Sequence, residues 1–395
     1  LNDEWPCLGN WAADTFGGFN SKVYEKVFEL VLRLKGNFMW PAMWNSAFYD
    51  DDPMNGPLAD EMGIVMSTSH HEPMGLAQQD WKRRGTGAWN YQTNGQVLRD
   101  FWQTGMERCK DWESIITIGM RGDGDEAMSA ETNTALLEKI VKDQRKIIEK
   151  VTKKKAKETP QVWALYKEVQ DYYDQGMRVP DDVTLLLCDD NWGNVRRLPA
   201  IGSKPRKGGY GMYYHVDYVG APRNSKWMNI SQVQRMWEQL SLTYEHGVRE
   251  LWVLNVGDLK PMEYPIQFFL DLAWNPQQYN EDNLLLHTED FCTQQFGEKY
   301  AKQAAYLIDN YSKFNRRITP ELLTSRTYSL DKYNEWERVK NEYAALAMEA
   351  LKLYYLMPES HRDAFDQLVL FPIQACANLY EMYYAHAMNH ALAAK

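Results

Sequence analysis

Short apolar runs alternate with amphipathic stretches along the first two thirds of the chain. Each apolar run is bounded by turn-forming residues, which is typical of a buried strand, and the stretches between runs repeat apolar residues at helical spacing. We predict strands at residues 36–40, 64–69, 114–119, 161–166, 183–188, 211–215 and 250–255. We predict helices at residues 23–34, 96–109, 133–155 and 231–246.

This alternation predicts a parallel sheet, because each helix is long enough to connect the end of one strand to the start of the next. The repeated βα unit favours the α/β class and, within it, a TIM-like (β/α)8 barrel. An eighth strand is needed to close such a barrel. We expect it to be the first strand, ending at Leu1 and truncated, because residues 2–5 have the polar character of a strand-end loop.

The pattern changes at about residue 281, where the strand signals stop. Residues 298–314, 332–356 and 359–393 have the spacing of long amphipathic helices, and Pro358 separates the last two. We therefore predict a catalytic barrel over residues 1–280 and an all-helical domain over residues 281–395. Because the chain starts in a predicted loop and ends inside a predicted helix, we expect a fragment of a longer protein.

Composition narrows the class of protein. The chain has 44 basic and 54 acidic residues and a net charge of −10, which argues against binding to nucleic acids or anionic membranes, since such proteins present a basic face. No apolar run approaches the roughly 20 residues that span a bilayer. The five cysteines are widely spaced and indicate neither a disulfide framework nor a zinc site. The 15 tryptophans and 24 tyrosines suit stacking on sugars, although we expect most of them in the core.

Polar side chains follow most of the predicted strands. In a parallel barrel the catalytic groups project from the carboxyl ends of different strands, so these residues are candidates for a site. A single carboxylate at a strand end is more often a helix cap, but carboxylates at several ends around one mouth indicate an enzyme. The candidates are Asp3, Glu4, Trp40, Asn45, His70, His71, Glu72, Arg121, Asp123, Asp125, Glu126, Glu168, Asp189, Asp190, Asn191, Tyr218, Asn255 and Asp258.

Two kinds of chemistry use several carboxylates in one site. A glycoside hydrolase needs one protonated carboxyl as the acid and one ionised carboxylate as the base or nucleophile. A metal-dependent hydrolase would use oxygen ligands with an added histidine, but no HExxH or His-x-His spacing supports it, so we expect neither a metal nor a cofactor. A non-catalytic carbohydrate-binding protein on the same barrel is a further alternative. The metal ligands considered are Asp123, Asp125 and Asp189 with His70 or His71.

The segment from residue 190 to residue 226 is basic in an otherwise acidic chain. A guanidinium pairs with a carboxylate in bidentate geometry, so a basic loop beside the mouth would suit an acidic sugar. For any one of these cations, solvent exposure or pairing with the acidic strand ends is the more frequent explanation. The cations are Arg196, Arg197, Lys204, Arg206, Lys207, Arg223 and Lys226.

Six motifs stand out when the chain is read as a whole. They are LNDEWP (1–6), STSHHEPM (67–74), GMRGDGDE (119–126), YKEV (166–169), CDDNWGNVRRLP (188–199) and YYHVDY (213–218). Together they resemble glycoside hydrolase family 115, the xylan α-1,2-glucuronidases, over most of residues 1–275. The resemblance implies a (β/α)8 catalytic barrel followed by a helical domain. It also implies an inverting enzyme that removes glucuronic acid, or its 4-O-methyl form, from the xylose backbone of glucuronoxylan.

The resemblance implies roles for individual residues. Glu168 is expected to protonate the leaving xylose oxygen and Asp189 to help activate water, with Asp125 and Asp3 in the same pocket and Asp123 as a competitor to Asp125. Inversion requires the two carboxyls to lie roughly 6.5–9.5 Å apart, whereas about 5–5.5 Å would indicate retention. The expected substrate-binding residues are Asn2, His70, Arg121, Asp123, Tyr166, Asn191, Arg196, Arg197 and Tyr218.

Members of the family carry a further domain before the barrel and a β-rich domain after the helices. Without the first strand a sheet edge would stay unpaired, so we expect residues 1–395 alone to be unstable or inactive. The expected partners are glucuronoxylan or glucuronic-acid-decorated xylo-oligosaccharides, and a second copy of the chain, in a homodimer formed through the helical region or the C-terminal region beyond it. We expect a secreted or periplasmic protein whose targeting segment lies outside this chain.

Overall fold

The computed structural model of the protein describes residues 1, 5–128, 134–220 and 223–393. Two compact units are present. The first consists of Leu1–His215 with Gln239–Lys260, and the second of Val216–Glu238 with Pro261–Lys395. Each unit is described by itself below. The predicted domain boundary at residue 280 stays a prediction.

The first unit is built on seven parallel strands. Their bounds are β1 Phe38–Met39, β2 Val65–Met66, β3 Ile116–Thr117, β4 Gln161–Ala164, β5 Thr184–Cys188, β6 Tyr210–His215 and β7 Leu251–Asn255. Strands β3 to β7 form one sheet in sequence order, and β1 pairs with β2. A parallel bridge between Met66 and Ser114 connects the pair to the start of β3. All seven predicted strands are therefore found, most of them shorter than predicted.

The predicted (β/α)8 barrel is confirmed only in part. Consecutive parallel strands connected by helices are present, and the five-stranded sheet curls like half a barrel. An eighth strand and closure of the ring are not seen in the described part of the chain. The interior is apolar at the centre of the sheet, where Leu185, Leu186 and Leu187 of β5 are all buried. Such continuous apolar runs are expected of parallel strands covered on both faces.

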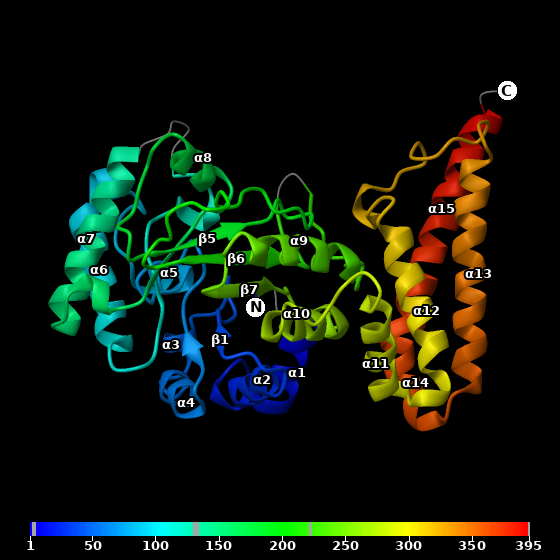
Figure 1. Cartoon of the computed structure of the whole chain (residues 1–395), viewed down its shortest axis with the longest axis horizontal. Helices are drawn as coiled ribbons and strands as arrows, with labels where there is room; N and C mark the ends of the chain where they lie inside the picture. The colour runs from blue at the N-terminus through cyan, green and yellow to red at the C-terminus, as the bar shows by residue number, and fades with distance from the viewer. Residues whose placement is uncertain (2–4, 129–133, 221–222, 394–395) are drawn as a thin grey trace. The chain divides into compact units, whose positions relative to one another are not determined.

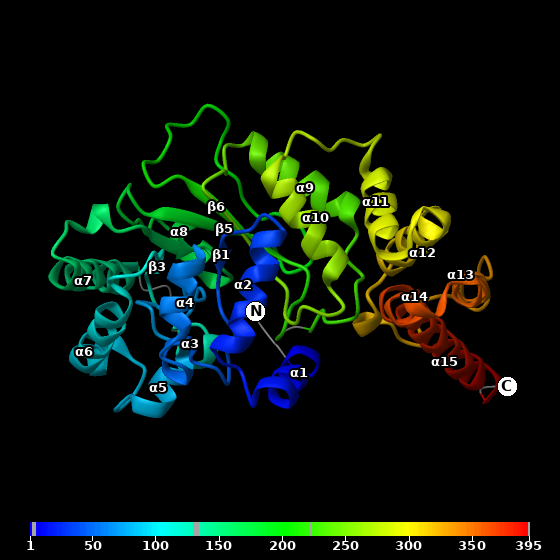
Figure 2. The ribbon, with the colours of Figure 1, turned by 90° about the horizontal axis from the view of Figure 1, so that it is seen from below.

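Helices α1 and α2 precede the first strand of this unit, later helices connect its strands, and α9 is divided between the two units after Glu238. Their bounds are α1 Cys7–Phe16, α2 Ser21–Arg33, α3 Phe48–Asp51, α4 Asn55–Met62, α5 Gln78–Arg84, α6 Tyr91–Cys109, α7 Thr134–Thr152, α8 Glu168–Asp174 and α9 Val233–Glu245. Helix α6 begins where the side chain of Asn90 accepts hydrogen bonds from the backbone N–H groups of Gln92 and Thr93, at 2.9 and 3.2 Å, as a capping asparagine does. Helices α6 and α7 pack side by side (Figures 1 and 2).

Long helices make up most of the second unit. Their bounds are α10 Glu263–Trp274, α11 Leu284–Phe296, α12 Glu298–Asn315, α13 Glu335–Leu356, α14 Glu359–Phe365 and α15 Phe371–Ala393. Helix α13 packs against both α12 and α15 (Figure 1). The core of this unit is rich in tyrosine, and the rings of Tyr343 and Tyr380 lie 4.3 Å apart.

The predicted helix over residues 359–393 is interrupted. A π-helical turn, Asp366–Leu370, separates α14 from α15. Pro372 is the second residue of α15, and because proline has no N–H it removes a regular helical hydrogen bond at this point. No helix among the described residues has both the length and the apolar character needed to cross a bilayer.

Candidate active site

Polar side chains meet at the carboxyl ends of strands β2 to β6. The loop after β2 contributes His70 and His71, the loop after β3 contributes Arg121, Asp123 and Asp125, β4 leads to Tyr166 and Glu168, β5 leads to Asp189 and Asn191, and His215 ends β6. Because the carboxyl ends of parallel strands share one edge of the sheet, residues far apart in the sequence are brought together there.

Arg121 connects two of these strand ends. Its Nε and Nη2 donate hydrogen bonds to the two carboxylate oxygens of Glu168 at 2.9 and 2.6 Å. Its Nη1 donates to the backbone carbonyl of Asp125 at 2.6 Å and to the Asp125 carboxylate. The arginine side chain is only 4% exposed, whereas that of Glu168 is 21% exposed. Charge-assisted bonds of this fork geometry fix the planes of both partners, so a rigid guanidinium holds Glu168 at the surface of the site.

Asp125 also contacts the histidine pair. Its Oδ1 lies 3.0 Å from Nε2 of His70 and 3.7 Å from Nδ1 of His71. Burial, followed by the positive charge of Arg121, holds the pKa of His70 well below its ordinary value, and burial does the same for His71. A neutral His70 donates from Nε2 to Asp125 and accepts at Nδ1 from the hydroxyl of Ser69, 3.0 Å away.

Asp189 is held below the surface of the site. Its Oδ1 lies 2.6 Å from Nδ1 of His215, and its Oδ2 accepts the backbone N–H of the same residue at 3.2 Å. The backbone N–H of Asn191 donates to Oδ1, also at 3.2 Å. The side chain of Asp189 is 0% exposed. Asp189 is therefore placed to orient His215, whose side chain is 2% exposed, and the two are buried together below the site.

Aromatic rings surround these charged groups. Tyr166 lies 4.3 Å from the ring of His70 and stacks on His215 at 5.6 Å with an angle of 23°. Tyr213 contacts His215 at 4.3 Å and Trp40 at 4.9 Å, between ring centroids. These buried rings reduce the access of water, which strengthens the electrostatic interactions among the charged groups.

Three residues beside the site have left-handed backbone torsions. They are Asp125 with φ of 66°, Lys167 with φ of 48° and Asn191 with φ of 67°. Lys167 combines its positive φ with a ψ of −124° and directly precedes Glu168, the first residue of α8. Backbone strain in residues other than glycine is concentrated at active sites and ligand-binding loops. Positive φ also occurs away from this edge, so the observation that supports the functional assignment is the unusual φ and ψ combination of Lys167 directly before Glu168.

Asp123 faces a different set of partners from Asp125. Its Oδ1 accepts a hydrogen bond from Nε2 of Gln78 at 2.6 Å, and the backbone N–H of Gln78 donates to the carboxyl of Glu72 at 2.8 Å. Glu72 is 3% exposed, and burial raises its pKa to about 7. Asp123 is thus tied to the loop after β2, while Asp125 is tied to Arg121.

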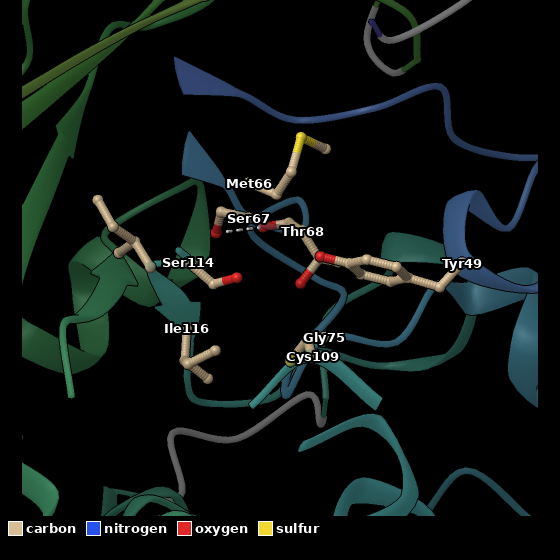
Figure 3. Close-up of a pocket in the computed structure, with 9 residues that line it drawn as sticks. Tyr49, Met66, Ser67, Thr68, Gly75, Cys109, Ser114 and Ile116 are labelled. Carbon is tan, nitrogen blue, oxygen red and sulfur yellow. Dashed lines mark hydrogen bonds between the residues drawn. The ribbon is translucent and has the colours of Figure 1, made fainter. Parts of the chain in front are cut away.

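A chain of hydroxyl groups supports the loop that carries the histidines. The hydroxyls of Ser67 and Thr117 lie 3.1 Å apart, Thr117 donates to the carbonyl of Thr68 at 2.5 Å, and the hydroxyl of Thr68 donates to the carbonyl of Glu72. Ser67 and Thr68 line a small cavity that Tyr49 also lines (Figure 3). The cavity volume of about 10 Å³ suits about one water molecule. It is too small for a sugar.

Other predicted residues lie apart from this cluster or outside the described residues. Arg196 donates to the backbone carbonyl of Lys167 at 3.2 Å, and Arg197 forms an ion pair with Asp174 at 2.7 Å. Tyr218 belongs to the second unit. The predicted residues outside the described part of the chain are Asn2, Asp3 and Glu4.

Two positions of the candidate site were not predicted. His215 was not given a role, although a polar residue at the end of a predicted strand was the signal that could have identified it. Lys167 has no sequence signal, because its importance lies in its backbone torsions. Asp258, one of the strand-end candidates, is a helix cap instead, since its Oδ2 accepts the backbone N–H groups of Cys7 and Leu8 at 3.0 and 3.1 Å.

Comparison with known proteins places the chain. No protein with a curated description matches the sequence. A solved structure described as a novel family GH115 4-O-methyl-alpha-glucuronidase with specificity for decorated arabinogalactans is similar, with 31% identity and a TM-score of 0.89. The alignment covers 97% of this chain and 54% of that one, so the chain spans about half the length of its relative. The model of glycosyl hydrolase family 115 matches residues 1–322, and the chain therefore belongs to this family.

Proposed function

We propose that the chain carries the catalytic site of a glycoside hydrolase. The enzyme removes glucuronic acid or 4-O-methyl-glucuronic acid that is α-1,2-linked to the xylose backbone of glucuronoxylan, and it inverts the anomeric configuration. The observation that carries the proposal is the arrangement around Arg121, which holds Glu168 and Asp125 together at the carboxyl edge of a parallel sheet. Membership of family 115 supports it.

Glu168 is the carboxyl that we assign to the proton donor. Its side chain is partly exposed, whereas that of Asp189 is fully buried. Both Glu168 oxygens accept hydrogen bonds from Arg121, so a proton can be carried only when one of these bonds is given up. The carboxylate of a bound uronic acid is a competing acceptor for the same guanidinium. Substrate binding would in this way release Glu168 for proton transfer.

Asp189 acts on water through His215 in this mechanism. The 2.6 Å contact between Asp189 and Nδ1 of His215 fixes the orientation of the imidazole, and an oriented imidazole is a suitable general base. The family resemblance assigns Asp125 and Asp3 to the same acidic pocket, with Asp123 as the competitor to Asp125, and we keep that assignment as part of the proposal. Sugar contacts are assigned to Asn2, His70, Arg121, Asp123, Tyr166, Asn191, Arg196, Arg197 and Tyr218.

A second substrate follows from the comparison. The similar structure is described as acting on decorated arabinogalactans, and the uronic acid that its name implies is the same 4-O-methyl sugar. The same site chemistry therefore serves glucuronic acid on a galactan as well as on a xylan. Which polysaccharide loses its uronic acid side chain depends on residues around the leaving group and not on the groups that bind the uronic acid.

The test uses the full-length parent protein. Release of glucuronic acid from glucuronoxylan and from decorated arabinogalactan is measured beside Glu168→Gln and Asp189→Asn, and NMR identifies the first-formed anomer. We expect release by the parent and a loss of more than about a thousandfold in both variants. Asp182→Asn is the matched control, because Asp182 forms a comparable fork with Arg145 outside the site. A folded parent that releases no uronic acid from either polymer contradicts the proposal.

We further propose that the seven strands belong to a closed (β/α)8 barrel and that the protein is secreted or periplasmic, where plant polysaccharides are met. A homodimer formed through the helical region is also proposed. A structure of the full-length parent tests barrel closure, light scattering of the same sample tests the dimer, and fractionation of the source cells tests the location. An open sheet, a monomer or a cytoplasmic protein would contradict the respective proposal.

A further inference from the structure

Three potential metal ligands lie close together inside the candidate site. Nε2 of His70, Nδ1 of His71 and a carboxylate oxygen of Asp125 all lie within 4.8 Å of one another. The His70 and His71 nitrogens are 3.0 and 3.7 Å from Oδ1 of Asp125. A tetrahedral zinc ion with ligands at about 2.0–2.2 Å places neighbouring ligand atoms roughly 3.3–3.5 Å apart. The cluster is thus close to the size of a zinc site before any side chain moves.

His71 supplies a second, independent observation. Its ring is 1% exposed, and neither ring nitrogen has a hydrogen-bond partner within the described residues. The ring is held in place by stacking on Trp44, at 5.6 Å and 26°. A buried imidazole without partners is unfavourable unless a ligand satisfies it. Because Nδ1 of this ring points towards Asp125, the ligand it suits is one shared with that carboxylate.

The surroundings also match a metal site. Histidine ligands are usually oriented through their second ring nitrogen by a hydrogen bond to a neighbouring group. With a metal bound, His70 takes the other tautomer: Nδ1 donates to the hydroxyl of Ser69, 3.0 Å away, and the unprotonated Nε2 binds the metal in place of its bond to Asp125. The loop between these histidines and α5 is held by the bond from the Thr68 hydroxyl to the carbonyl of Glu72.

We propose that His70, His71 and Asp125 bind one divalent transition-metal ion of the zinc class. The ligands are Nε2 of His70, Nδ1 of His71 and one carboxylate oxygen of Asp125, and water fills the fourth position. Arg121 competes with the ion for the Asp125 carboxylate, because its Nη1 already donates a hydrogen bond to that group. On metal binding Arg121 gives up this bond and keeps its fork with Glu168. The ion therefore occupies space beside the proton donor and competes with the sugar.

This inference does not rest on the proposed function, since it concerns binding of a metal alone. It has a consequence for the enzyme, however. If the site also binds glucuronic acid, zinc inhibits uronic acid release. Inhibition should then saturate over the same zinc concentrations as direct zinc binding. Metal-assisted catalysis is not implied.

A second histidine pair provides the control for the test. His386 and His390 lie one turn apart on α15, with their Nε2 atoms 2.7 Å apart, and both are exposed. Two histidines at this spacing on a helix can bind a transition metal by themselves. Any binding study must therefore separate the two positions, and the double variant His386→Ala/His390→Ala does so.

The full-length parent protein is treated with a chelator and titrated with Zn²⁺ by calorimetry, and with Co²⁺ by absorption spectroscopy to report coordination geometry. We expect tetrahedral Co²⁺ bands and one site that the double variant retains. His71→Ala and Asp125→Asn should each weaken that site at least about a hundredfold, because each removes one of three ligands. Circular dichroism of each variant checks folding, and Asp125→Asn, which keeps the shape of the side chain, guards against a misfolded His71→Ala.

Two results would overturn the proposal. One is Zn²⁺ binding that disappears in the double variant and persists in His71→Ala and Asp125→Asn, because it would assign the metal to α15. The other is no Zn²⁺ binding to the folded chain, in which case the unpartnered His71 would be explained by a sugar hydroxyl.

Discussion

Arg121 and Glu168 are joined by two parallel hydrogen bonds, of 2.9 and 2.6 Å, across 47 residues of sequence. The arginine lies in the loop after β3 and the glutamate begins α8 after β4, so the pair connects neighbouring strands. Only a planar guanidinium makes such a fork, and its remaining nitrogen reaches Asp125. One side chain thus sets the position of two carboxylates.

Arg121→Lys should leave the carboxylates of Glu168 and Asp125 without a fixed position. A lysine keeps the charge but forms single contacts, so Glu168 loses one of its two bonds and Asp125 becomes free to move. We expect uronic acid release by the full-length protein to fall by at least about a hundredfold, because small misplacements of a catalytic group have effects of this size. Arg145→Lys is the control, since Arg145 makes a similar fork to Asp182, at 2.8 and 3.2 Å. Equal activities of the two variants would contradict the argument.

Thr117→Val tests the hydroxyl chain beneath the histidine loop. Valine has the same shape as threonine but cannot donate to the buried carbonyl of Thr68, so that acceptor loses its 2.5 Å bond. We expect the free energy of unfolding to fall by about 1–3 kcal/mol and activity to fall as well, because the loop carries His70 and His71. Thermal and denaturant unfolding measure the first effect.

Thr243→Val is the matched control for that change. Thr243 is equally buried, but its hydroxyl donates to the carbonyl of Gln239 one turn earlier in α9, at 2.7 Å. That carbonyl also accepts a backbone hydrogen bond within the helix. Losing the hydroxyl therefore leaves the carbonyl with a hydrogen-bond donor. A loss of stability in Thr243→Val as large as in Thr117→Val would mean that the hydroxyl chain has no special role.

The strands could be predicted from the sequence because the interior of a parallel sheet demands continuous apolar runs. Residues 183–188 illustrate this, since β5 occupies all but the first of them. The candidate site followed from the same signal, as strand ends share one edge. Short helices such as α3 and α4 were not predicted, because four to eight residues hold too little periodicity.

The pairing of the site residues could not be predicted in the same way. Nothing in the sequence indicates that Arg121 bonds Glu168 rather than Asp189, since the choice depends on the torsions of the loops between strand and side chain. Lys167 shows this most clearly, because its positive φ turns the chain immediately before Glu168. The partnership of Asp189 with His215 likewise depends on the register of β5 against β6, which pairs Cys188 with Tyr213.

Glu72→Gln should change the pH dependence of stability. Burial raises the pKa of Glu72 from 4.5 to about 7 in the folded protein, so the folded state binds its proton more tightly than the unfolded state does. This stabilising contribution is fully present below pH 4.5 and is lost as the pH rises through about 7. A shift of this size corresponds to about 3 kcal/mol.

The measurement for Glu72 is chemical denaturation between pH 4.5 and pH 8. The free energy of unfolding of the unchanged protein should fall across this window relative to that of Glu72→Gln, which cannot titrate. Glu61→Gln, on the exposed side of α4, is the control and should follow the unchanged protein. Parallel curves for the unchanged protein and Glu72→Gln would show that the buried carboxyl does not titrate in this range.

Asn191 allows backbone and side-chain roles to be separated. Its φ of 67° is left-handed, its backbone N–H donates to Asp189, and its side-chain oxygen is buried without a partner among the described residues. Glycine accepts this torsion readily, whereas alanine destabilises it by roughly 1 kcal/mol. If the amide binds the sugar, Asn191→Gly and Asn191→Ala should lose activity to the same extent, while only the alanine variant loses stability.

Asn334 provides the comparison for this pair of variants. Its φ of 49° is also left-handed, and it precedes α13 without a side-chain capping bond. Asn334→Ala should therefore be less stable than Asn334→Gly by a similar amount, with activity unchanged in both. If Asn191→Gly keeps full activity while Asn191→Ala loses it, the residue serves the site only through its backbone, and the substrate contact assigned to its amide is wrong.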